Sequence, residues 1–535
     1  MPKRRTTCRT SSQVTQNIAR AILRSTLLAA GIAALCGQTS SPPPLSTILA
    51  NHLAALAALH LREPQTHQDS GTLDGAGVSG RFQEWQEGDK ERRDELFGIR
   101  TERMLRVGDH LWEQNANGEI RELEGIVARR QITEDFIDSG LFARHPQYVH
   151  YVDRETLPDG RTIYQLRVAP PDGETYEVGI DANTWLIDEK AYADHDSLQI
   201  AIFSDYHVID GFLIPFTEVD SDGDHAFDIT SRVTSVSVDQ PISPAIFDPF
   251  TPEVVENTAP VTIPFQERGG LIYTQVTIAN KPYTFLIDSA SQGDVFDPML
   301  AAALGLHPEG SVEIRGAGRT TSPGVIETPP ISLGGVVFPM HIATVVDMPS
   351  LLAMHVDGIL GYPFFAAAEL RFDPTRQTLT IAPPKSLPRD GTRIDVDTDR
   401  ELPEVEGQLD NVPARLIIDT GDANELLVFK SFIDAHPGVI QLANFGPVSN
   451  SGIGGSVNAV GTIVDVLQLG PYRLFNRYAD VVLGTTGAFA DRNDGGNVGF
   501  GSLRNFVLTF DLSDHALYLQ PAAGFNDGHA RRVPD

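Results

Sequence analysis

Two short stretches decide how the larger part of this chain folds. They read Tyr-Thr-Phe-Leu-Ile-Asp-Ser-Ala at 283–290 and Ala-Arg-Leu-Ile-Ile-Asp-Thr-Gly at 414–421. In each, an apolar run with strand character stops at an aspartate, Asp288 or Asp419, and a hydroxyl-bearing residue follows. The pattern predicts two buried strands, each of which delivers one carboxylate to the mouth of a turn.

The surroundings of the two stretches are repeated as well. A Gly-rich segment follows each aspartate, Asp-Gly-Ile-Leu-Gly at 357–361 and Asn-Val-Gly-Phe-Gly at 497–501. A Phe-Asp pair begins 84 residues after the first aspartate and 91 residues after the second. Because the same features occur twice in the same order, residues 261–535 are predicted to be an internal repeat of two β-rich halves.

Two strand-end acids that face each other could perform acid–base chemistry. Like charges a few ångströms apart cannot both ionise at low cost, so Asp288 and Asp419 would share a proton and titrate as a pair. One carboxylate could then deprotonate a water while the other donates a proton to the reacting group. Gly421 would let the backbone pass close to the acids. Neither a metal nor a cofactor is required by this chemistry.

These residues resemble the aspartic proteases of the retropepsin and pepsin superfamily, with both lobes in one chain. Asp-Thr-Gly at 419–421 and Gly-Ile-Leu-Gly at 358–361 carry the resemblance, which covers 261–535. It implies an endopeptidase that binds an extended peptide or protein substrate between two lobes. It also implies that the hydroxyls of Ser289 and Thr420 bond across to the opposite loop.

The same resemblance assigns roles to two sets of glycines. One set would pack behind the dyad, and the other would belong to flaps that close over the substrate, although neither flap segment contains a tyrosine. The packing glycines are Gly358, Gly361, Gly499 and Gly501, and the flap candidates are Gly316, Gly318, Gly452 and Gly454.

The first lobe departs from the family pattern at one position. Ala290 stands where the family has glycine, and its methyl group could crowd the substrate or restrict the backbone. A catalytically inactive peptide-binding relative therefore stays open as an alternative.

The N-terminal segment differs from the rest of the chain. Basic residues precede a short apolar run that ends at Cys36, which predicts a secretory signal peptide over 1–37 and a periplasmic or secreted protein. Both cysteines, Cys8 and Cys36, lie in this segment, so a mature chain would contain no disulfide. Lipid attachment at Cys36 is a further alternative. No later stretch is long and apolar enough for a membrane anchor.

Residues 38–250 predict a separate α+β domain. Apolar residues recur at helical spacing over 48–61, and a series of β-rich stretches separated by turn sequences follows, which indicates a run of antiparallel hairpins. This pattern resembles the curved-sheet fold of bacterial lipoprotein carriers. The resemblance implies a hydrophobic ligand or an extended peptide on the sheet, whereas the residues alone are equally consistent with a supporting domain.

Composition excludes some classes of function. A formal net charge of −30 disfavours nucleic acid and anionic lipid surfaces as partners. The spacing of His145 and His150 does not fit a zinc protease, and Asp220–Asp224 lacks the later Glu of a calcium loop.

The sequence therefore predicts a mainly β protein: a two-lobed aspartic protease preceded by a domain with a curved antiparallel sheet. The competing hypothesis is a non-catalytic carrier of peptide or lipid on a degenerate protease fold. The expected parts are a signal peptide at 1–37, a sheet domain at 38–250, a linker at 251–260, a first lobe at 261–385 and a second lobe at 386–535.

Overall fold

The computed structural model describes residues 42–194, 197–251, 255, 257, 259–317, 320–338, 342–348, 356–442, 445–484, 487–491 and 493–529. The expected signal peptide with its two cysteines lies outside the described residues, as does Gly318. The chain divides into two compact units, Met1–Glu63 with Arg129–Thr230 and Pro64–Ala128 with Ser231–Asp535. In the part of the chain that is described, no helix is both long and apolar enough to cross a bilayer.

The first unit is an antiparallel sheet with the strand order β12-β11-β10-β9-β8-β7, accompanied by helices. Alternation along β9 places Tyr176, Val178 and Ile180 in its core, together with Ile48 and Phe142 from helices. The elements are α2 (Leu45–Ala58), α3 (Gly125–Asp138), α4 (Leu141–Arg144), η1 (Pro146–Tyr148), β7 (Val149–Thr156), β8 (Thr162–Val168), β9 (Tyr176–Asp181), β10 (Ile187–Asp194), β11 (Ser197–Ile209) and β12 (Phe212–Ser221).

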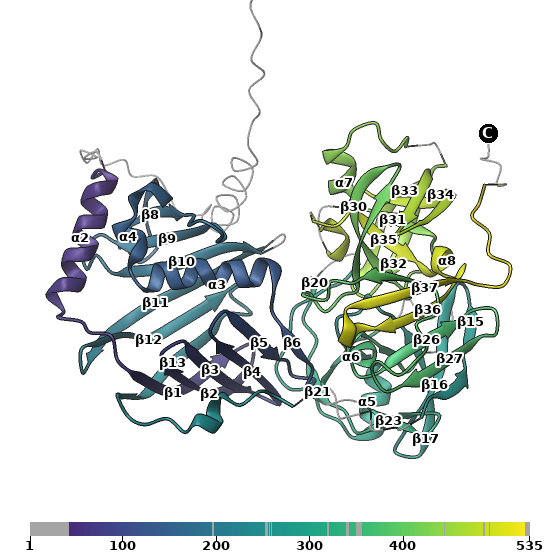
Figure 1. Ribbon diagram of the computed structural model, residues 1–535, viewed down its shortest axis with the longest axis horizontal. Helices are drawn as coiled ribbons and strands as arrows, with labels where there is room; N and C mark the ends of the chain where they lie inside the picture. The colour runs from purple at the N-terminus through teal and green to yellow at the C-terminus, as the bar shows by residue number, and fades with distance from the viewer. Residues whose placement is uncertain are drawn as a thin grey trace, which may run out of the picture. The chain divides into compact units, whose positions relative to one another are not determined.

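Helix α3 was not predicted, whereas α2 was expected three residues further along the chain. Figure 1 shows α3 running across the strands of this unit. Its sequence is a poor helix signal, because charged residues interrupt the apolar ones and only Thr133 and Ile137 are buried. Contacts with the sheet therefore stabilise the helix. In one of them, Glu134 of α3 accepts a hydrogen bond from the hydroxyl of Tyr176 at 2.8 Å.

The second unit begins with a run of antiparallel hairpins in the order β6-β5-β4-β3-β2-β1-β13. The first turn has positive φ at both of its central residues, 46° at Ala76 and 81° at Gly77, as the twist of a two-residue hairpin requires. The strands are β1 (Thr66–Gly75), β2 (Val78–Glu87), β3 (Lys90–Phe97), β4 (Arg100–Val107), β5 (His110–Gln114), β6 (Ile120–Glu122) and β13 (Ile229–Val238), and η2 (Pro244–Phe247) follows.

The remainder of the second unit is made of two lobes. The first lobe is a sheet in the order β21-β24-β18-β25-β17-β16-β22-β23, with β15 paired to β16 and a separate hairpin β19-β20. Its elements are β15 (Gln266–Arg268), β16 (Leu271–Ile278), β17 (Lys281–Ile287), β18 (Asp294–Phe296), α5 (Pro298–Leu304), β19 (Ile314–Arg315), β20 (Thr320–Thr321), β21 (Val325–Glu327), β22 (Ile331–Leu333), β23 (Val336–Phe338), β24 (Ile342–Val345), β25 (Gly358–Leu360) and α6 (Tyr362–Ala366).

The second lobe is a sheet in the order β29-β30-β35-β31-β34-β33-β32. Strand β33 pairs with β34 over residues 459–469 and, at its other end, with β32 over residues 455–460. The elements are β29 (Glu404–Leu409), β30 (Val412–Asp419), β31 (Leu426–Val428), α7 (Lys430–Ala435), β32 (Pro447–Gly452), β33 (Gly455–Leu469), β34 (Tyr472–Val482), η4 (Ala488–Ala490), β35 (Gly496–Gly499) and α8 (Phe500–Leu503).

Both lobes contribute strands to a six-stranded sheet in the order β14-β27-β26-β36-β37-β28. At its centre Leu370 pairs with Phe510 and Phe372 with Leu508, so the two Phe-Asp copies of the repeat lie side by side. The strands are β14 (Val261–Pro264), β26 (Glu369–Asp373), β27 (Thr378–Ala382), β28 (Thr392–Asp395), β36 (Phe506–Asp511) and β37 (Ala516–Pro521), with η5 (Leu512–Asp514) before the last. The mainly β, two-lobed architecture after an antiparallel sheet is thus confirmed.

The register shows which residues of the two lobes are equivalent. In each lobe the strand that leads to the aspartate pairs in parallel with the Gly-rich segment. Leu286, two residues before Asp288, lies beside Ile359, and Ile417, two residues before Asp419, lies beside Asn497. Ile359 and Asn497 therefore occupy equivalent positions in the two halves of the repeat.

Candidate active site

The two aspartates lie at equivalent strand ends. Asp288 directly follows β17 and its N–H donates to the carbonyl of Leu360 at 3.0 Å, while Asp419 is the last residue of β30. In each, carboxylate oxygen Oδ1 accepts from the N–H two residues further on: Ala290 donates to Asp288 and Gly421 to Asp419, both at 2.9 Å. The turn thus holds each carboxylate in one orientation.

Four hydrogen bonds tie the two loops together. The Ser289 hydroxyl donates to the carbonyl of Ile418 at 2.6 Å and accepts from the N–H of Thr420 at 3.0 Å. The Thr420 hydroxyl donates to the carbonyl of Ile287 at 3.0 Å and accepts from the N–H of Ser289 at 2.9 Å. Because each hydroxyl uses both its donor and its acceptor capacity across the lobe boundary, the pair fixes one loop against the other.

The carboxyl group of Asp288 lies beside the loop that carries Asp419, since a Cβ atom at position 421 would lie 2.2 Å from its Cγ. The negative charge of Asp288 acts on Asp419, so the two acids titrate as a pair. Burial raises the pKa of Asp288 to about 6, against the contribution of the Ala290 N–H. Burial, followed by the negative charges of Asp288 and Asp422, raises the pKa of Asp419 well above its ordinary value. The geometry therefore holds a dyad that retains a proton in mildly acidic solution.

Gly421 and Ala290 are equivalent in sequence but have different surroundings. A Cβ atom at position 421 would lie 2.2 Å from Cγ of Asp288, so a side chain there would displace the first carboxylate. Ala290 instead packs against an apolar cluster of the second lobe that includes Ile417 and Leu427, and its φ angle is not positive. The opposite lobe therefore accommodates the Ala290 side chain.

Asn497 is part of the site and was missing from the sequence prediction. Its Nδ2 donates to Oδ2 of Asp419 at 2.6 Å, and its side chain is buried. The donation favours the ionised form of Asp419 and lowers its pKa. Matching the segments 357–361 and 497–501 by sequence places Asn497 opposite Asp357, and only the strand register shows that it is equivalent to Ile359.

The glycines behind the dyad allow close backbone contacts. A Cβ at Gly361 would lie 2.3 Å from the carbonyl oxygen of Gly293, and one at Gly499 would lie 2.2 Å from that of Asn424. Gly358 and Gly501 are hemmed in similarly. The N–H of Gly361 donates to Oδ1 of Asp294 at 2.7 Å, and burial raises the pKa of that carboxyl to about 7. Gly361 and Gly499 therefore pack directly against the two loops that carry Asp288 and Asp419.

The two candidate flap segments touch each other. The N–H of Ala317 donates to the carbonyl of Ile453 at 2.7 Å, and a Cβ at Gly316 would lie 2.1 Å from that same oxygen. Gly452 and Gly455 are paired across the β32-β33 turn, where Gly454 and Gly455 have φ of 79° and 112°. Tips from both lobes thus meet, as an arrangement that covers a cleft requires.

Among the described residues, one cluster has the donor types of a metal site. His67 and Asp69 of β1 and Glu84 of β2 share one face of the sheet, and their nearest ligand atoms lie within 4.8 Å of one another. Arg93 donates to Glu84 at 2.9 Å, and Nε2 of His67 lies 3.2 Å from Oδ1 of Asp69. Arg93 and His67 therefore offset part of the acidic charge of this cluster. Burial, followed by the charge of Asp69, raises the pKa of Glu84 to about 7.

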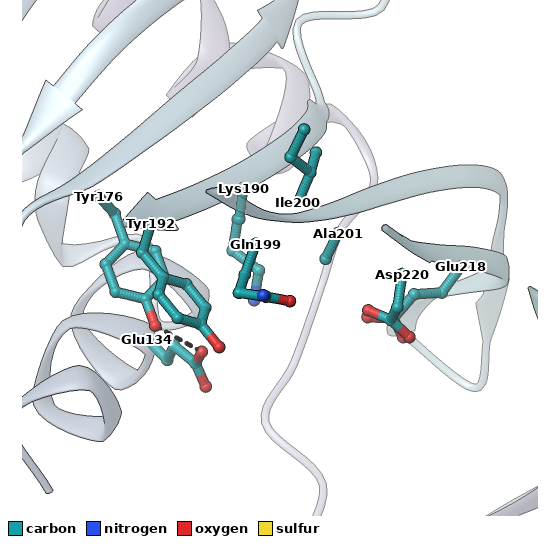
Figure 2. A pocket seen from close by; sticks show the side chains of 9 residues that line it. All are labelled: Glu134, Tyr176, Lys190, Tyr192, Gln199, Ile200, Ala201, Glu218 and Asp220. Atoms are coloured by element: carbon teal, nitrogen blue, oxygen red, sulfur yellow. Dashed lines mark hydrogen bonds between the residues drawn. The ribbon is translucent and has the colours of Figure 1, made fainter. Parts of the chain in front are cut away.

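The first unit contains a pocket of about 200 Å³ between α3 and the sheet. Figure 2 shows Glu134 beneath the rings of Tyr176 and Tyr192, with Glu218 and Asp220 across the pocket. The remaining lining residues are Lys190, Gln199, Ile200 and Ala201. The lining is mostly polar and does not include either residue of the dyad.

A family model described as aspartyl protease matches residues 274–364. This range includes Asp288 and the Gly-Ile-Leu-Gly segment, so the resemblance predicted from these residues is confirmed for the first lobe. Asp419 lies beyond the matched range, and its equivalence rests on the internal repeat and the register above. No curated protein matches the chain.

Solved structures are similar to about two fifths of the chain. A putative outer membrane lipoprotein-sorting protein domain from Vibrio parahaemolyticus is 10% identical, with 38% of this chain and 95% of that chain covered and a TM-score of 0.26. A DUF1329 family protein from Desulfovibrio piger is 15% identical, with coverage of 39% and 98% and a TM-score of 0.27. A LolA superfamily protein from Nitrosomonas europaea is 15% identical, with coverage of 37% and 97% and a TM-score of 0.26.

Proposed function

We propose that this protein is an exported aspartic endopeptidase in which Asp288 and Asp419 activate a water molecule. The observation that carries the proposal is the paired geometry of the two acids: equivalent strand ends, mirrored N–H contacts and loops that the hydroxyls of Ser289 and Thr420 tie together. A dyad that holds one proton has both the base and the acid that peptide hydrolysis needs.

The chemistry follows from this arrangement. Water bound between the carboxyl groups gives a proton to the ionised carboxylate as its oxygen attacks the peptide carbonyl carbon. The protonated carboxyl stabilises the developing oxyanion, and a proton then passes to the leaving nitrogen as the C–N bond breaks. Ser289 and Thr420 keep the two loops in register, and closure of the flaps over the substrate excludes bulk water.

The proposal is tested with the full chain, with Asp288→Asn and Asp419→Asn, and with Asp465→Asn as a matched control. Asp465 lies on β33 and is exposed. Incubation with a diverse peptide mixture between pH 3 and 8 should show cleavage by the parent and the control, and loss of cleavage in both dyad variants. Thermal unfolding confirms that all variants are folded. Equal cleavage by all four proteins, or cleavage by none, contradicts the proposal.

The carrier hypothesis has one specific observation in its favour, the pocket of the first unit. Glu134, Lys190, Glu218 and Asp220 make its lining charged, so it fits a polar ligand better than an acyl chain. Under this hypothesis a ligand binds with equal affinity to the parent and the dyad variants, and no peptide is cleaved. Calorimetric titration with an acyl chain and with a polar amine separates the two ligand chemistries.

A further inference from the structure

Two further acids lie beside the dyad in the second lobe. Asp422 follows Asp419 by three residues, and Asp480 is on β34 in register with Leu427 of β31. Leu427 is in turn in register with Asn497, which donates to Asp419. Residues in register on neighbouring strands share a face of the sheet. Asp480 and Asn497 therefore lie on the face of the second lobe that carries the dyad.

The first lobe has no acid at the equivalent positions. Its corresponding row runs from Thr344 through Val295 and Ile359 to Leu286. Val295, Ile359 and Leu286 belong to an apolar cluster. Thr344 thus stands where the second lobe has Asp480, and the residue three positions after Asp288 is Ser291 where the second lobe has Asp422. Since the fold forms with uncharged residues at these positions, the acids of the second lobe are not a requirement of the architecture.

The carboxylates of Asp422 and Asp480 are not fully satisfied within the described part of the protein. Asp480 is 4% exposed, and its Oδ1 accepts no hydrogen bond. Burial and the negative charge of Asp480 raise the pKa of Tyr478. Oδ1 of Asp422 accepts from the N–H of Asn424 at 2.9 Å, but its buried Oδ2 accepts none. A buried carboxylate oxygen without a donor is costly, so a donor from outside the chain would stabilise it.

Charge repulsion between the acids further disfavours their ionised forms. Burial raises the pKa of Asp422 to about 6, and the negative charges of Asp480 and Asp288 act in the same direction. A positive charge placed between the two acids would relieve both effects. Lysine and arginine side chains carry such a charge together with several N–H donors, and arginine can bond to two carboxylate oxygens at once.

We propose that Asp422 and Asp480 form a subsite that binds the side chain of a lysine or arginine residue next to the scissile peptide bond. This inference rests on the proposed endopeptidase activity. The two lobes then differ at equivalent positions: the second lobe offers Asp422 and Asp480 to a basic side chain, where the first lobe has Ser291 and Thr344. The substrate class is peptides with a basic residue on one side of the cleaved bond.

Two matched peptides test the subsite. They differ only in the flanking residue, which is lysine in one and its uncharged isostere norleucine in the other. With the parent, kcat/KM should be about tenfold or more higher for the lysine peptide, as expected for a charge-assisted hydrogen bond. Asp480→Asn and the double change Asp422→Ser with Asp480→Thr, which installs the residues of the first lobe, should reduce this ratio to near one. Asp465→Asn should keep it.

A binding measurement keeps this inference separate from the proposed activity. Calorimetry with Asp288→Asn and the same two peptides should show tighter binding of the lysine peptide by a similar factor, and the additional Asp480→Asn change should remove the difference. If the parent cleaves both peptides equally well, the proposed subsite is contradicted and the proposed endopeptidase activity is supported. If no peptide is cleaved but the binding preference is present, the proposed activity is contradicted and the proposed subsite is supported. Dependence of the preference on a divalent metal ion, shown by its loss with a chelator, would also overturn the subsite.

Discussion

Asn497 donates a 2.6 Å hydrogen bond to Asp419, whereas its counterpart in the other lobe, Ile359, has no polar atom in its side chain. The two loops that carry Asp288 and Asp419 are otherwise nearly symmetric, with mirrored contacts from the N–H groups of Ala290 and Gly421. A symmetric pair of acids would have no preferred base. The amide of Asn497 favours negative charge on Asp419, and we infer that it is a positioning residue that makes the two acids chemically unequal.

Replacing Asn497 with leucine tests this role. The loss of a donor to a carboxylate raises the dyad's apparent pKa values, so the pH–activity profile should move to higher pH by about one unit. The same change should lower kcat by about tenfold. Asn497→Gln offers the amide on a longer chain and should recover part of the parent profile. An unchanged profile with lower kcat would assign Asn497 to packing alone.

Activity should depend on which carboxyl of the pair is ionised. Burial raises the pKa of Asp288 to about 6, and burial followed by the negative charge of Asp288 raises that of Asp419, so Asp288 ionises first and Asp419 keeps the proton. We therefore expect kcat to rise as pH rises from 4 to 6, because the state with one proton forms over this range. Initial rates on one peptide across this range, with ionic strength held constant, check the prediction. A rate that falls between pH 4 and 6 would contradict it.

Stability should depend on pH through the same group. A carboxyl whose pKa is about 6 in the folded protein but near 4 when unfolded favours folding most below pH 4, and the contribution is lost as pH rises through 6. Asp288→Asn removes this penalty, so its unfolding free energy at pH 7 should exceed that of the parent by about 1–3 kcal/mol. At pH 3.5 the two should be equal. Denaturant unfolding at both values measures the difference.

The cross-links between the loops should stabilise the molecule. Ser289→Ala removes one donor and one acceptor, leaving the carbonyl of Ile418 and the N–H of Thr420 buried without that partner. A loss of about 2 kcal/mol in unfolding free energy is expected, together with reduced kcat because the acids are no longer held in register. Ser289→Thr copies the second lobe and should retain both bonds. A threonine variant as unstable as the alanine variant would contradict this account.

The two residues that follow the hydroxyls should respond in opposite ways to exchange. Gly421→Ala places a methyl group against Asp288, so kcat/KM should fall by a factor of about 100 or more because the dyad is displaced. Ala290→Gly removes a methyl group that packs against the second lobe and should leave the acids in place, at a cost of roughly 1 kcal/mol in stability. Comparable losses of activity in both variants would show that the methyl of Ala290 has a catalytic role.

Much of the fold could be predicted from local patterns. Apolar runs predict the strands before Asp288 and Asp419, and turn residues predict the hairpins. Both signals are local, because side-chain alternation and positive φ depend on neighbouring residues only. Helix α3 was missed because its charged residues obscure the apolar stripe, and its position depends on the sheet it covers. The pairing of the two Phe-Asp copies in one sheet also went unpredicted, because strand pairing over such separations leaves no local trace.

For the site, the sequence by itself determined which two acids end the repeated strands and which hydroxyls follow them, because a duplicated motif can be recognised from the order of its residues. Only the tertiary structure decided that Asn497 bonds to Asp419 and that Asp480 shares the face of the dyad. These residues lie far along the chain from the acids and reach them through strand register, a property of the folded sheet. Functional groups within one segment can be predicted from the sequence, whereas groups brought together from different strands depend on how those strands pair.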